Sequence, residues 1–406
     1  MKIQKIAILG IVALLLLAPV IAGTQESNRY LIKSNNGYLK GLFGVQHEFK
    51  QGFTTDLTQG QLITLKKFGV EIEKVQMYAF TGLAVCGDGI IHPSEKCGEE
   101  GAKGCSDGFV CQECRCVKDK SEEPEPEPIR QVPDNQIPYG IAMVNGGSGG
   151  AGINVAVLDS GVARGHPDLD IKLCADASSH PKRVEEGTCA DNIGHGTHVS
   201  GTIGANGGED GLGIYGVAPE SNLWMIKVGD GGIYADDLAE GIYYATDKGA
   251  NIISMSLGGN ESDQLVYDAV KYAYDNGVLI IAAAGNGGEY NDSVSYPARY
   301  PEVVSVSAID SNKEIAFFST TGAEVELTAP GVDVESTAGG MDYFVTRKWY
   351  SYHSGTSMAT PHISGLAAKV WQGNAQDTRT YLHTIAEDLY TEGRDNLTGF
   401  GLPIAV

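Results

Sequence analysis

A regular alternation of apolar runs with amphipathic helical stretches begins near residue 137 and limits the possible folds more than any other feature. Short, mainly apolar runs are typical of strands that are buried on both faces of a parallel sheet. Such runs occupy residues 153–158, 223–228, 252–255, 278–284 and 303–306, with helical stretches such as 235–248 and 262–276 between them. The alternation predicts an α/β domain over residues 135–406. Its open, mostly parallel sheet should be flanked by helices, and functional side chains should follow the carboxyl ends of the strands.

Residues 1–22 have the pattern of a secretory signal peptide. Lys2 and Lys5 precede an apolar run at 6–21, which closes on small residues. A membrane anchor is the alternative, but the run is shorter than the ~20 residues that a membrane span prefers, and Gly10 and Pro19 interrupt it. We therefore expect a secreted, extracellular protein with no membrane association after the signal is removed.

The eight cysteines agree with export. Six of them lie between residues 86 and 116, and the other two are Cys174 and Cys189. An even number in a secreted chain favours disulfides, although Cys111, Cys114 and Cys116 also have the spacing of zinc ligands. A bridge between Cys174 and Cys189 would close a loop of about 15 residues, which stabilises a fold by roughly 3 kcal/mol.

Three further segments precede the α/β domain. Residues 23–82 predict a small α+β unit, with strand-like runs at 30–32 and 75–78 and a helix at 57–68 that Asp56 could cap. Residues 83–117 form a disulfide-rich knot, and residues 118–134 form an acidic linker whose alternating Glu and Pro should stay extended. The chain has 29 Lys and Arg against 51 Asp and Glu, a net charge of −22, so nucleic acid is not an expected partner.

Four side chains supply the parts that acyl transfer needs. Asp159 and Asn286 follow apolar strands, His195 lies between glycines at a predicted helix start, and Ser357 lies where Pro361 predicts the start of another helix. Each has an ordinary alternative: a turn for Asp159 and Asn286, a helix cap for Ser357, and a metal site or a structural hydrogen bond for the histidines of H-G-T-H. Taken together, Ser357 would be the nucleophile and His195 its general base and acid. Asp159 would orient His195, and Asn286 would donate to the oxyanion beside the Ser357 N–H.

The order Asp, His, Ser and the surrounding residues resemble the subtilisin-family serine proteases. The resemblance runs from residue 137 to the end. Its motifs are I-P-Y-G-I at 137–141, H-P-D-L at 166–169, H-G-T-H-V at 195–199, I-S-M-S-L-G-G at 253–259, A-A-A-G-N at 282–286, S-Y-P-A-R-Y-P at 295–301, T-A-P-G at 328–331 and G-T-S-M-A-T-P-H at 355–362. It implies a subtilisin-like fold and a broad endopeptidase that acts on proteins and peptides.

The resemblance also assigns substrate-binding residues. Ser256, Leu257 and Gly258 would pair with the substrate backbone as a strand, which explains tolerance of many sequences. The pocket for the residue before the cut would be walled by Ala283, Gly285 and Ser295. A glycine is frequent in the family at the position of Ser295, and an apolar or aromatic preference is expected.

A calcium ion is implied by the same resemblance. Asp168 matches a family ligand, and the glycine-rich loop at 205–214 matches the calcium loop but is slightly longer. The predicted oxygen ligands are Asp168, Asp210, Asn135 and the carbonyl groups of Gly208, Leu212 and Ile214. Glu209 could replace Asp210, and a solvated loop without metal is the alternative.

Residues 23–82 resemble the family's propeptide in size and position, and would act as an intramolecular inhibitor and chaperone. Its last residues should lie in the cleft, so we expect the precursor to be cut between Met77 and Leu83. The competing position is the linker at 118–134. A non-catalytic subtilase that binds partners through its cysteine knot is the alternative function. An esterase on another α/β scaffold would require G-x-S-x-G and Ser before His, and the sequence has neither.

Overall fold

The structure is a computed structural model that describes residues 29–67, 69–80, 109–112, 115–118, 133, 135–178, 184–288, 294–346 and 348–406. The predicted signal peptide, most of the cysteine-rich knot and of the linker, and residues 81–83 lie outside the described residues. The chain forms two compact units, Met1–Gln76 with Ser179–Arg183, and Met77–Ser178 with Val184–Val406. Each unit is described by itself.

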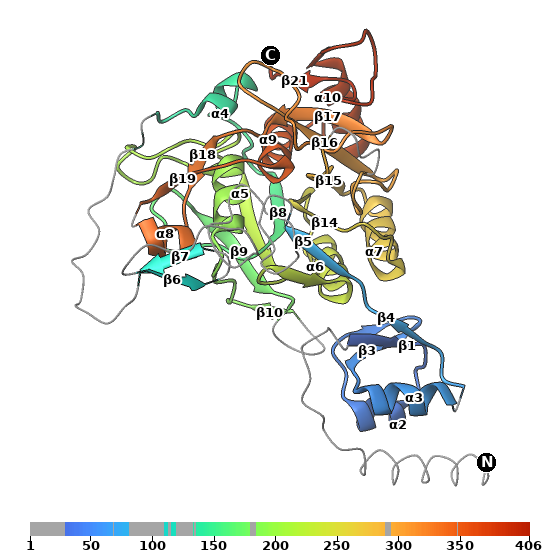
Figure 1. Cartoon of the computed structure of the whole chain (residues 1–406). Helices are drawn as coiled ribbons and strands as arrows, with labels where there is room; N and C mark the ends of the chain where they lie inside the picture. The colour runs from blue at the N-terminus through green and yellow to red at the C-terminus, as the bar shows by residue number, and fades with distance from the viewer. Residues whose placement is uncertain are drawn as a thin grey trace. The chain divides into compact units, whose positions relative to one another are not determined.

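The first unit is an antiparallel sheet with two helices (Figure 1). The sheet has the order β2-β3-β1-β4, and its core contains Ile32, Phe53, Leu57 and Leu65. Its elements are β1 (Arg29–Ile32), α2 (Gly37–Phe43), β2 (Glu48–Phe49), β3 (Gly52–Asp56), α3 (Gln59–Lys67) and β4 (Ile72–Lys74).

The cap of α3 differs from the expectation. Asp56 ends β3, and the helix starts three residues later at Gln59. Thr58 takes the capping role, because its Oγ1 accepts from the Gln61 N–H at 3.3 Å while the Gln61 side chain accepts from the Thr58 N–H at 2.8 Å. This reciprocal pair is a capping box, which satisfies two donors that the first helical turn leaves open.

The second unit is built on an eight-stranded sheet of order β10-β9-β11-β8-β13-β15-β16-β17. Only the β10–β9 pair is antiparallel, so the sheet is mostly parallel, as predicted. The strands are β8 (Asn154–Asp159), β9 (Ile171–Asp176), β10 (Glu185–Glu186), β11 (Asn222–Lys227), β13 (Ile252–Met255), β15 (Leu279–Ala283), β16 (Val303–Ile309) and β17 (Val325–Pro330). The strand order changes direction at β8, which has β11 on one side and β13 on the other, and ligands of such sheets bind beyond the carboxyl ends of the strands at such a point.

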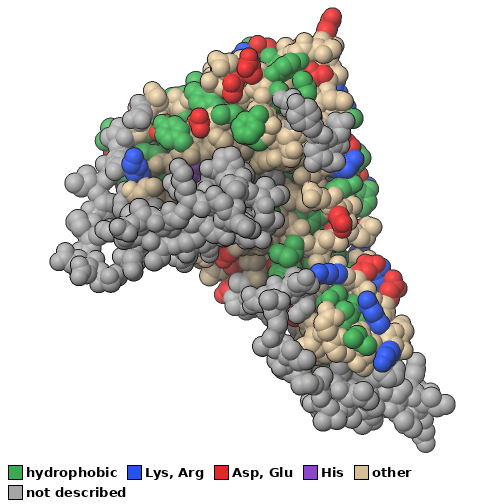
Figure 2. Space-filling model, in the orientation of Figure 1, with side chains coloured by type: hydrophobic (Ala, Val, Ile, Leu, Met, Phe, Trp, Pro, Cys, Tyr) green, Lys and Arg blue, Asp and Glu red, His purple; other side chains and the backbone are tan. Residues whose placement is uncertain are grey.

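Helices cover both faces of this sheet (Figure 1). The helices α5 and α9 pack against each other and, as a pair, contact β8, β13, β15 and β16. The helices α6 and α7 form a second pair, in which α6 contacts β8 and β11 and α7 contacts β15. The helices are α4 (Tyr139–Met143), α5 (His195–Gly204), α6 (Ala235–Asp247), α7 (Gln264–Asp275), α8 (Gly340–Thr346), α9 (Thr356–Lys369) and α10 (Ala375–Thr384). No helix among the described residues is both long and apolar enough to cross a membrane. On the face shown in Figure 2, acidic and basic side chains of the described residues lie interspersed.

Smaller sheets complete the second unit. The strand expected at 75–78 is shifted, because β4 ends at Lys74, residues 75 and 76 belong to no strand, and β5 (Met77–Phe80) starts at Met77. In the second unit, β5 lies between β12 (Gly232–Tyr234) and β14 (Leu257–Gly258). The remaining pairs are β6 (Phe109–Gln112) with β7 (Arg115–Lys118), β18 (Val334–Thr337) with β19 (Tyr350–His353), and β20 (Ala386–Glu387) with β21 (Leu402–Pro403). Cys111 and Cys116 are directly opposite each other in the β6–β7 hairpin.

Candidate active site

Asp159 and His195 form a buried pair at the carboxyl end of β8. Asp159 is the last residue of β8 and His195 is the first of α5, and both are at most 1% exposed. His195 Nδ1 lies 2.8 Å from Asp159 Oδ1, which also accepts from the Ser160 N–H at 2.7 Å. An ionised carboxylate can only accept, so Nδ1 carries the proton and Nε2 is left as the basic nitrogen.

Close packing around the pair depends on Gly196. A Cβ at this position would lie 2.2 Å from the Gly161 carbonyl oxygen and 3.0 Å from Asp159 Oδ1. Any larger residue would therefore push α5 away from the end of β8. His198, the other histidine of this helix, is a structural residue, since its Nε2 lies 3.0 Å from the Val334 carbonyl oxygen.

Ser357 is the second residue of α9, one residue further into the helix than its start at Thr356. It exchanges two hydrogen bonds with Ser256: Ser357 Oγ donates to the Ser256 carbonyl at 3.0 Å, and Ser256 Oγ donates to the Ser357 carbonyl at 2.8 Å. The second bond has a clear cause in the sequence. Pro361 stands four residues after Ser357 and has no N–H, so the Ser357 carbonyl lacks its usual helical donor. The Ser256 hydroxyl supplies one and ties the start of α9 to the end of β13.

Asn286 follows β15 and also contacts the start of α9. Its Oδ1 accepts from the Thr356 N–H at 3.0 Å and lies 3.1 Å from the Thr356 hydroxyl. A backbone N–H can only donate, so this contact fixes which end of the amide is oxygen. The NH₂ end is left as the donor. Thr356 therefore orients Asn286, a role that its position in the sequence did not reveal.

The strand β5 runs antiparallel between two edges beside these residues. Phe80 pairs with Leu257 and Ala79 with Gly258, while Tyr78 pairs with Ile233 on the opposite side. The Phe80 ring lies 5.0 Å from the His195 ring, and both Tyr78 and Phe80 are 2% exposed. A Cβ at Gly259 would approach Tyr78 Cδ1 to 3.0 Å, so the backbone at 259 forms one wall around the tyrosine.

The residues predicted to line the substrate pocket, Ala283, Gly285 and Ser295, lie close together at the carboxyl end of β15. Ala283 ends β15 and is fully buried, and Ser295 N–H donates to the Ala284 carbonyl at 2.8 Å. A Cβ at Gly285 would lie 2.5 Å from Ser295 Oγ. The Ser295 side chain thus occupies the space directly beside Gly285.

The loop expected to hold calcium wraps around Asp168, which is fully buried. Asp168 Oδ2 accepts from the Ile214 N–H at 3.0 Å and from the Tyr350 hydroxyl at 2.8 Å. A Cβ at Gly213 would lie 2.0 Å from Asp168 Oδ1, so only glycine allows the loop backbone to lie against the carboxylate.

The other predicted ligands are oxygen atoms of the same loop and of Asn135. Asp210 Oδ1 accepts from the Leu212 N–H at 2.9 Å, and the carbonyl groups of Ile214 and Gly208 each accept one amide hydrogen bond, from Gly207 and Gly211. Each carbonyl oxygen has a second lone pair that can still bind a cation. Carboxylate and carbonyl oxygens are the donors that calcium prefers, so the residues fit this ion. Gln136 was not predicted, yet it ties the entry segment to the loop by donating to Gly211 O at 2.6 Å.

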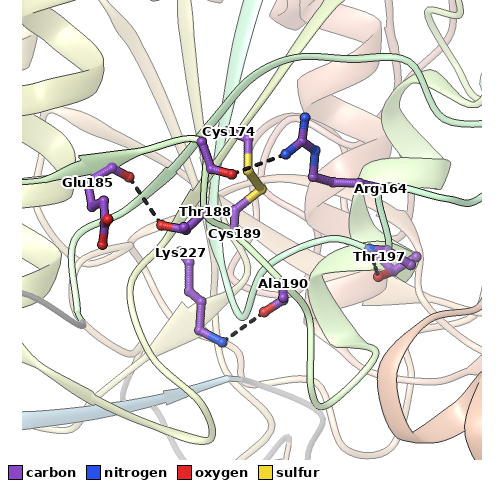
Figure 3. Close-up of a disulfide and its surroundings, with 10 residues drawn as sticks. Arg164, Cys174, Glu185, Thr188, Cys189, Ala190, Thr197 and Lys227 are labelled. Carbon is purple, nitrogen blue, oxygen red and sulfur yellow. Dashed lines mark hydrogen bonds between the residues drawn. A yellow bond between two sulfur atoms is a disulfide. The ribbon is translucent and has the colours of Figure 1, made fainter.

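A disulfide joins Cys174, on β9, to Cys189, fifteen residues later (Figure 3). The predicted bridge is therefore present. The segment that follows Cys189 is held by two more contacts: the Val162 N–H donates to the Cys189 carbonyl at 2.8 Å, and Lys227 Nζ donates to the Ala190 carbonyl at 2.9 Å. The segment leads directly into α5, so the bridge braces the approach to His195.

Comparisons with known proteins agree with this geometry. The family model described as Subtilase family matches residues 150–401. The chain is 34% identical to "Subtilisin" of Bacillus sp. (strain TA39) over 427 positions, which cover 93% of this chain and 90% of that protein. It is 40% identical to "Subtilisin BL" of Lederbergia lenta over 278 positions, covering 66% of this chain and 96% of the relative.

Solved structures give the same result. "Sphericase" superposes with a TM-score of 0.62 at 39% identity, covering 67% of this chain and 99% of that one. "S41 Psychrophilic Protease" has a TM-score of 0.61 at 40% identity, with the same coverage of 67% and 99%. The match of family, relatives and fold over the whole α/β unit identifies the chain as a member of the subtilase family of serine endopeptidases.

Proposed function

We propose that this subtilase is a secreted endopeptidase of broad specificity whose catalytic triad is Asp159, His195 and Ser357. The observation that carries the proposal is the buried Asp159–His195 hydrogen bond of 2.8 Å at the carboxyl end of β8, beside which β5 brings the Phe80 ring to 5.0 Å from His195. Subtilases that have lost catalysis need not keep such a pair, because burying a carboxylate costs free energy unless it is hydrogen-bonded.

In the proposed mechanism, His195 Nε2 takes the proton from Ser357 Oγ as this oxygen attacks the substrate carbonyl. The same nitrogen then gives the proton to the leaving amine, and water repeats the sequence on the acyl-enzyme. Asp159 keeps the proton on Nδ1 and stabilises the imidazolium. The Asn286 NH₂ group and the Ser357 N–H would donate to the oxyanion. The Ser357 N–H belongs to the first turn of α9, and Asn286 contacts this turn through Thr356.

Substrates would bind as β5 does. A peptide strand between β12 and β14 gains backbone hydrogen bonds on both edges, and these do not depend on side chains. Side chains alternate along a strand, so Tyr78 and Phe80 point to the same side and Ala79 to the other. Their burial supports an apolar or aromatic preference at these two positions. Ser256, Leu257 and Gly258 would bind the main chain, and Ala283, Gly285 and Ser295 would line the pocket beside the cut.

Residues 23–82 would act as the propeptide, both as intramolecular inhibitor and as folding chaperone. The ring contact between Phe80 and His195 supports a cut at the first or second peptide bond after Phe80, within the window from Met77 to Leu83. N-terminal sequencing of the active enzyme tests this position. A mature chain that starts after Val117 would instead place the cut in the linker and remove the cysteine-rich knot with the propeptide.

A calcium ion held by Asp168, Asp210, Asn135 and the carbonyl groups of Gly208, Leu212 and Ile214 would stabilise the enzyme without taking part in the reaction. It would cross-link the entry segment and the loop that follows α5. Its contribution is the electrostatic attraction between one divalent cation and these oxygen atoms.

The decisive experiment is casein digestion by the purified protein. Digestion should stop with a serine-reactive inhibitor, and Ser357→Ala should abolish it while leaving the circular dichroism spectrum unchanged. The same variant should accumulate as an uncut precursor. If Ser357→Ala digests casein at a rate comparable to the native enzyme, Ser357 is not the nucleophile.

A further inference from the structure

A second buried carboxylate, Asp191, lies four residues before His195 and has no part in the mechanism above. It is 8% exposed and is surrounded by five hydrogen-bond donors. Its Oδ1 accepts from the N–H groups of Ile193 at 3.0 Å and Gly194 at 2.8 Å and from the Ser160 hydroxyl at 2.9 Å. Its Oδ2 accepts from the Thr197 N–H at 2.9 Å and the Thr197 hydroxyl at 2.5 Å.

These contacts connect the two halves of the proposed catalytic pair. Ser160 directly follows Asp159, whereas Ile193, Gly194 and Thr197 surround the first turn of the helix that carries His195. The Ser160 hydroxyl also accepts from the Gly196 N–H at 2.9 Å, so it bridges the end of β8 and the start of α5 a second time. One carboxylate and one hydroxyl therefore set how far apart the two elements lie.

The pattern of donors requires Asp191 to be ionised. Gly196 donates to Ser160 Oγ, and the Ala163 N–H donates to Thr197 Oγ1 at 3.0 Å, so both hydroxyl groups turn their own hydrogen toward Asp191. With five donors aimed at its two oxygens, the carboxyl group has no acceptor for a proton of its own. Burial raises the pKa of Asp191 above its usual value, and hydrogen bonds from Thr197 and Gly194 offset part of this rise.

The surroundings hold this carboxylate in place. The Cys174–Cys189 disulfide and the Lys227 contact to Ala190 fix the two residues that precede it (Figure 3). The other charged or titratable groups near the catalytic pair are His198, the His353–Asp342 pair beside it, and the Lys227–Asp230 ion pair, in which Nζ and Oδ1 lie 2.6 Å apart. Asp191 forms hydrogen bonds both to Ser160, which follows β8, and to the first turn of α5.

We propose that Asp191 is a positioning residue for the catalytic pair, acting through Ser160 and the first turn of α5. Its fixed negative charge also stabilises the protonated form of His195. The inference rests on the proposed role of His195 as general base. Two consequences follow: weakening the bridge should lower kcat without changing KM, and removing the charge should make His195 less basic.

The first test is Ser160→Ala, which removes the hydroxyl bridge but keeps the backbone N–H bond to Asp159 and the charge of Asp191. Displacements near 1 Å cost on the order of 100-fold in rate, so we expect kcat to fall by about 10-fold to 100-fold with KM within about twofold. Active-site titration with a serine-reactive probe normalises kcat to folded enzyme. The matched control is Ser305→Ala, a fully buried serine of β16 whose hydroxyl has no hydrogen-bond partner in the described structure.

The second test is Asp191→Asn, which replaces one acceptor oxygen with a donor and removes the charge. Besides a lower kcat, the acid limb of the kcat/KM profile should move to lower pH by about 0.5 to 1 unit, because a nearby charge in a protein interior contributes on the order of 1 kcal/mol. The limb should not move in Ser160→Ala, which keeps the charge. A purely structural role would lower the fraction of titratable sites and leave the limb unmoved.

Failure of this inference and failure of the proposed function would give different results in these assays. If Ser357→Ala retains activity in the same assay, the triad is wrong. If Ser357→Ala is inactive but Ser160→Ala keeps kcat within twofold of the native enzyme, Asp191 does not position the pair. Should Asp191→Asn not fold, Ser160→Ala alone decides the positioning role.

Discussion

A fully buried histidine in α9 should lower the free energy of unfolding of this enzyme at acid pH. His362 is 0% exposed, and its Nδ1 lies 2.8 Å from the Met358 carbonyl oxygen, so Nδ1 carries a proton. A Cβ at Gly140 would lie 2.4 Å from His362 Nε2, which shows that the backbone at residue 140 leaves no room for water there. Burial lowers the pKa of His362 from 6.5 to about 4, because a charged ring could not be solvated at this place.

The sign and size follow from proton linkage. Above pH 6.5 the ring is neutral in both states and contributes no pH dependence. As the pH falls from 6.5 toward 4, the unfolded chain binds a proton that the folded chain does not, so the free energy of unfolding decreases. For a single group with these two pKa values, the loss between pH 7 and pH 4.5 is about 2.5 kcal/mol. Below pH 4 the folded state also binds the proton and the loss levels off.

The assay is equilibrium urea unfolding at pH 7 and pH 4.5, with Ser357→Ala as background to prevent self-digestion. In His362→Asn, the side-chain amide can donate to the Met358 carbonyl but does not titrate. This variant should lose about 2.5 kcal/mol less stability between the two pH values than its parent. Between pH 7 and pH 8 the difference between the two proteins should be constant, which is the internal control. Equal losses in both proteins between pH 7 and pH 4.5 would refute the reasoning.

Two further predictions concern cross-links. Calcium at a hundredfold excess over its Kd should stabilise the folded enzyme by about 3 kcal/mol, so a chelator should lower Tm, and Asp168→Ala should remove most of this dependence; an unchanged Tm with no bound metal by elemental analysis would argue against the site. Replacing Cys174 and Cys189 together by serine should cost roughly 3 kcal/mol of stability by loop entropy. Calorimetry checks this, and an unchanged Tm in the double serine variant would contradict a stabilising role of the bridge.

The sequence predicted the sheet well because its signals are local. Apolar runs marked β8, β11, β13 and β15 to within one residue, although β16 extends three residues beyond its predicted end and β9 and β17 were not predicted. Asp159 and Asn286, which follow such runs, could be recognised without knowing their neighbours. The strand at 77–80 was harder. Its predicted span, 75–78, began two residues early, in the connection between β4 and β5, since a four-residue strand is defined by its partners more than by its own composition.

Residues that act through contacts distant in sequence escaped prediction. Nothing in the sequence distinguishes Asp191 from an ordinary loop residue. Its five hydrogen-bond donors come together only because β8 and α5 converge. Thr356 orients Asn286 across 70 residues. The sequence does indicate that one carbonyl in α9 lacks its helical donor, because Pro361 has no N–H. It does not identify the Ser256 hydroxyl as the group that donates to this carbonyl instead.

The placement of β5 between two strands has a kinetic consequence for activation. Its backbone is paired on both edges, to β12 and to β14, and a cut beyond Phe80 breaks none of these hydrogen bonds. Cleavage and release would then be separate events, and the newly cut enzyme would remain occupied by its own product. Activity should appear after a lag. The first enzyme molecules to release β5 would digest the released propeptide, and this would speed the activation of the remaining molecules. The lag would therefore shorten as enzyme concentration rises, so that the onset of proteolysis is a property of the population rather than of the single molecule.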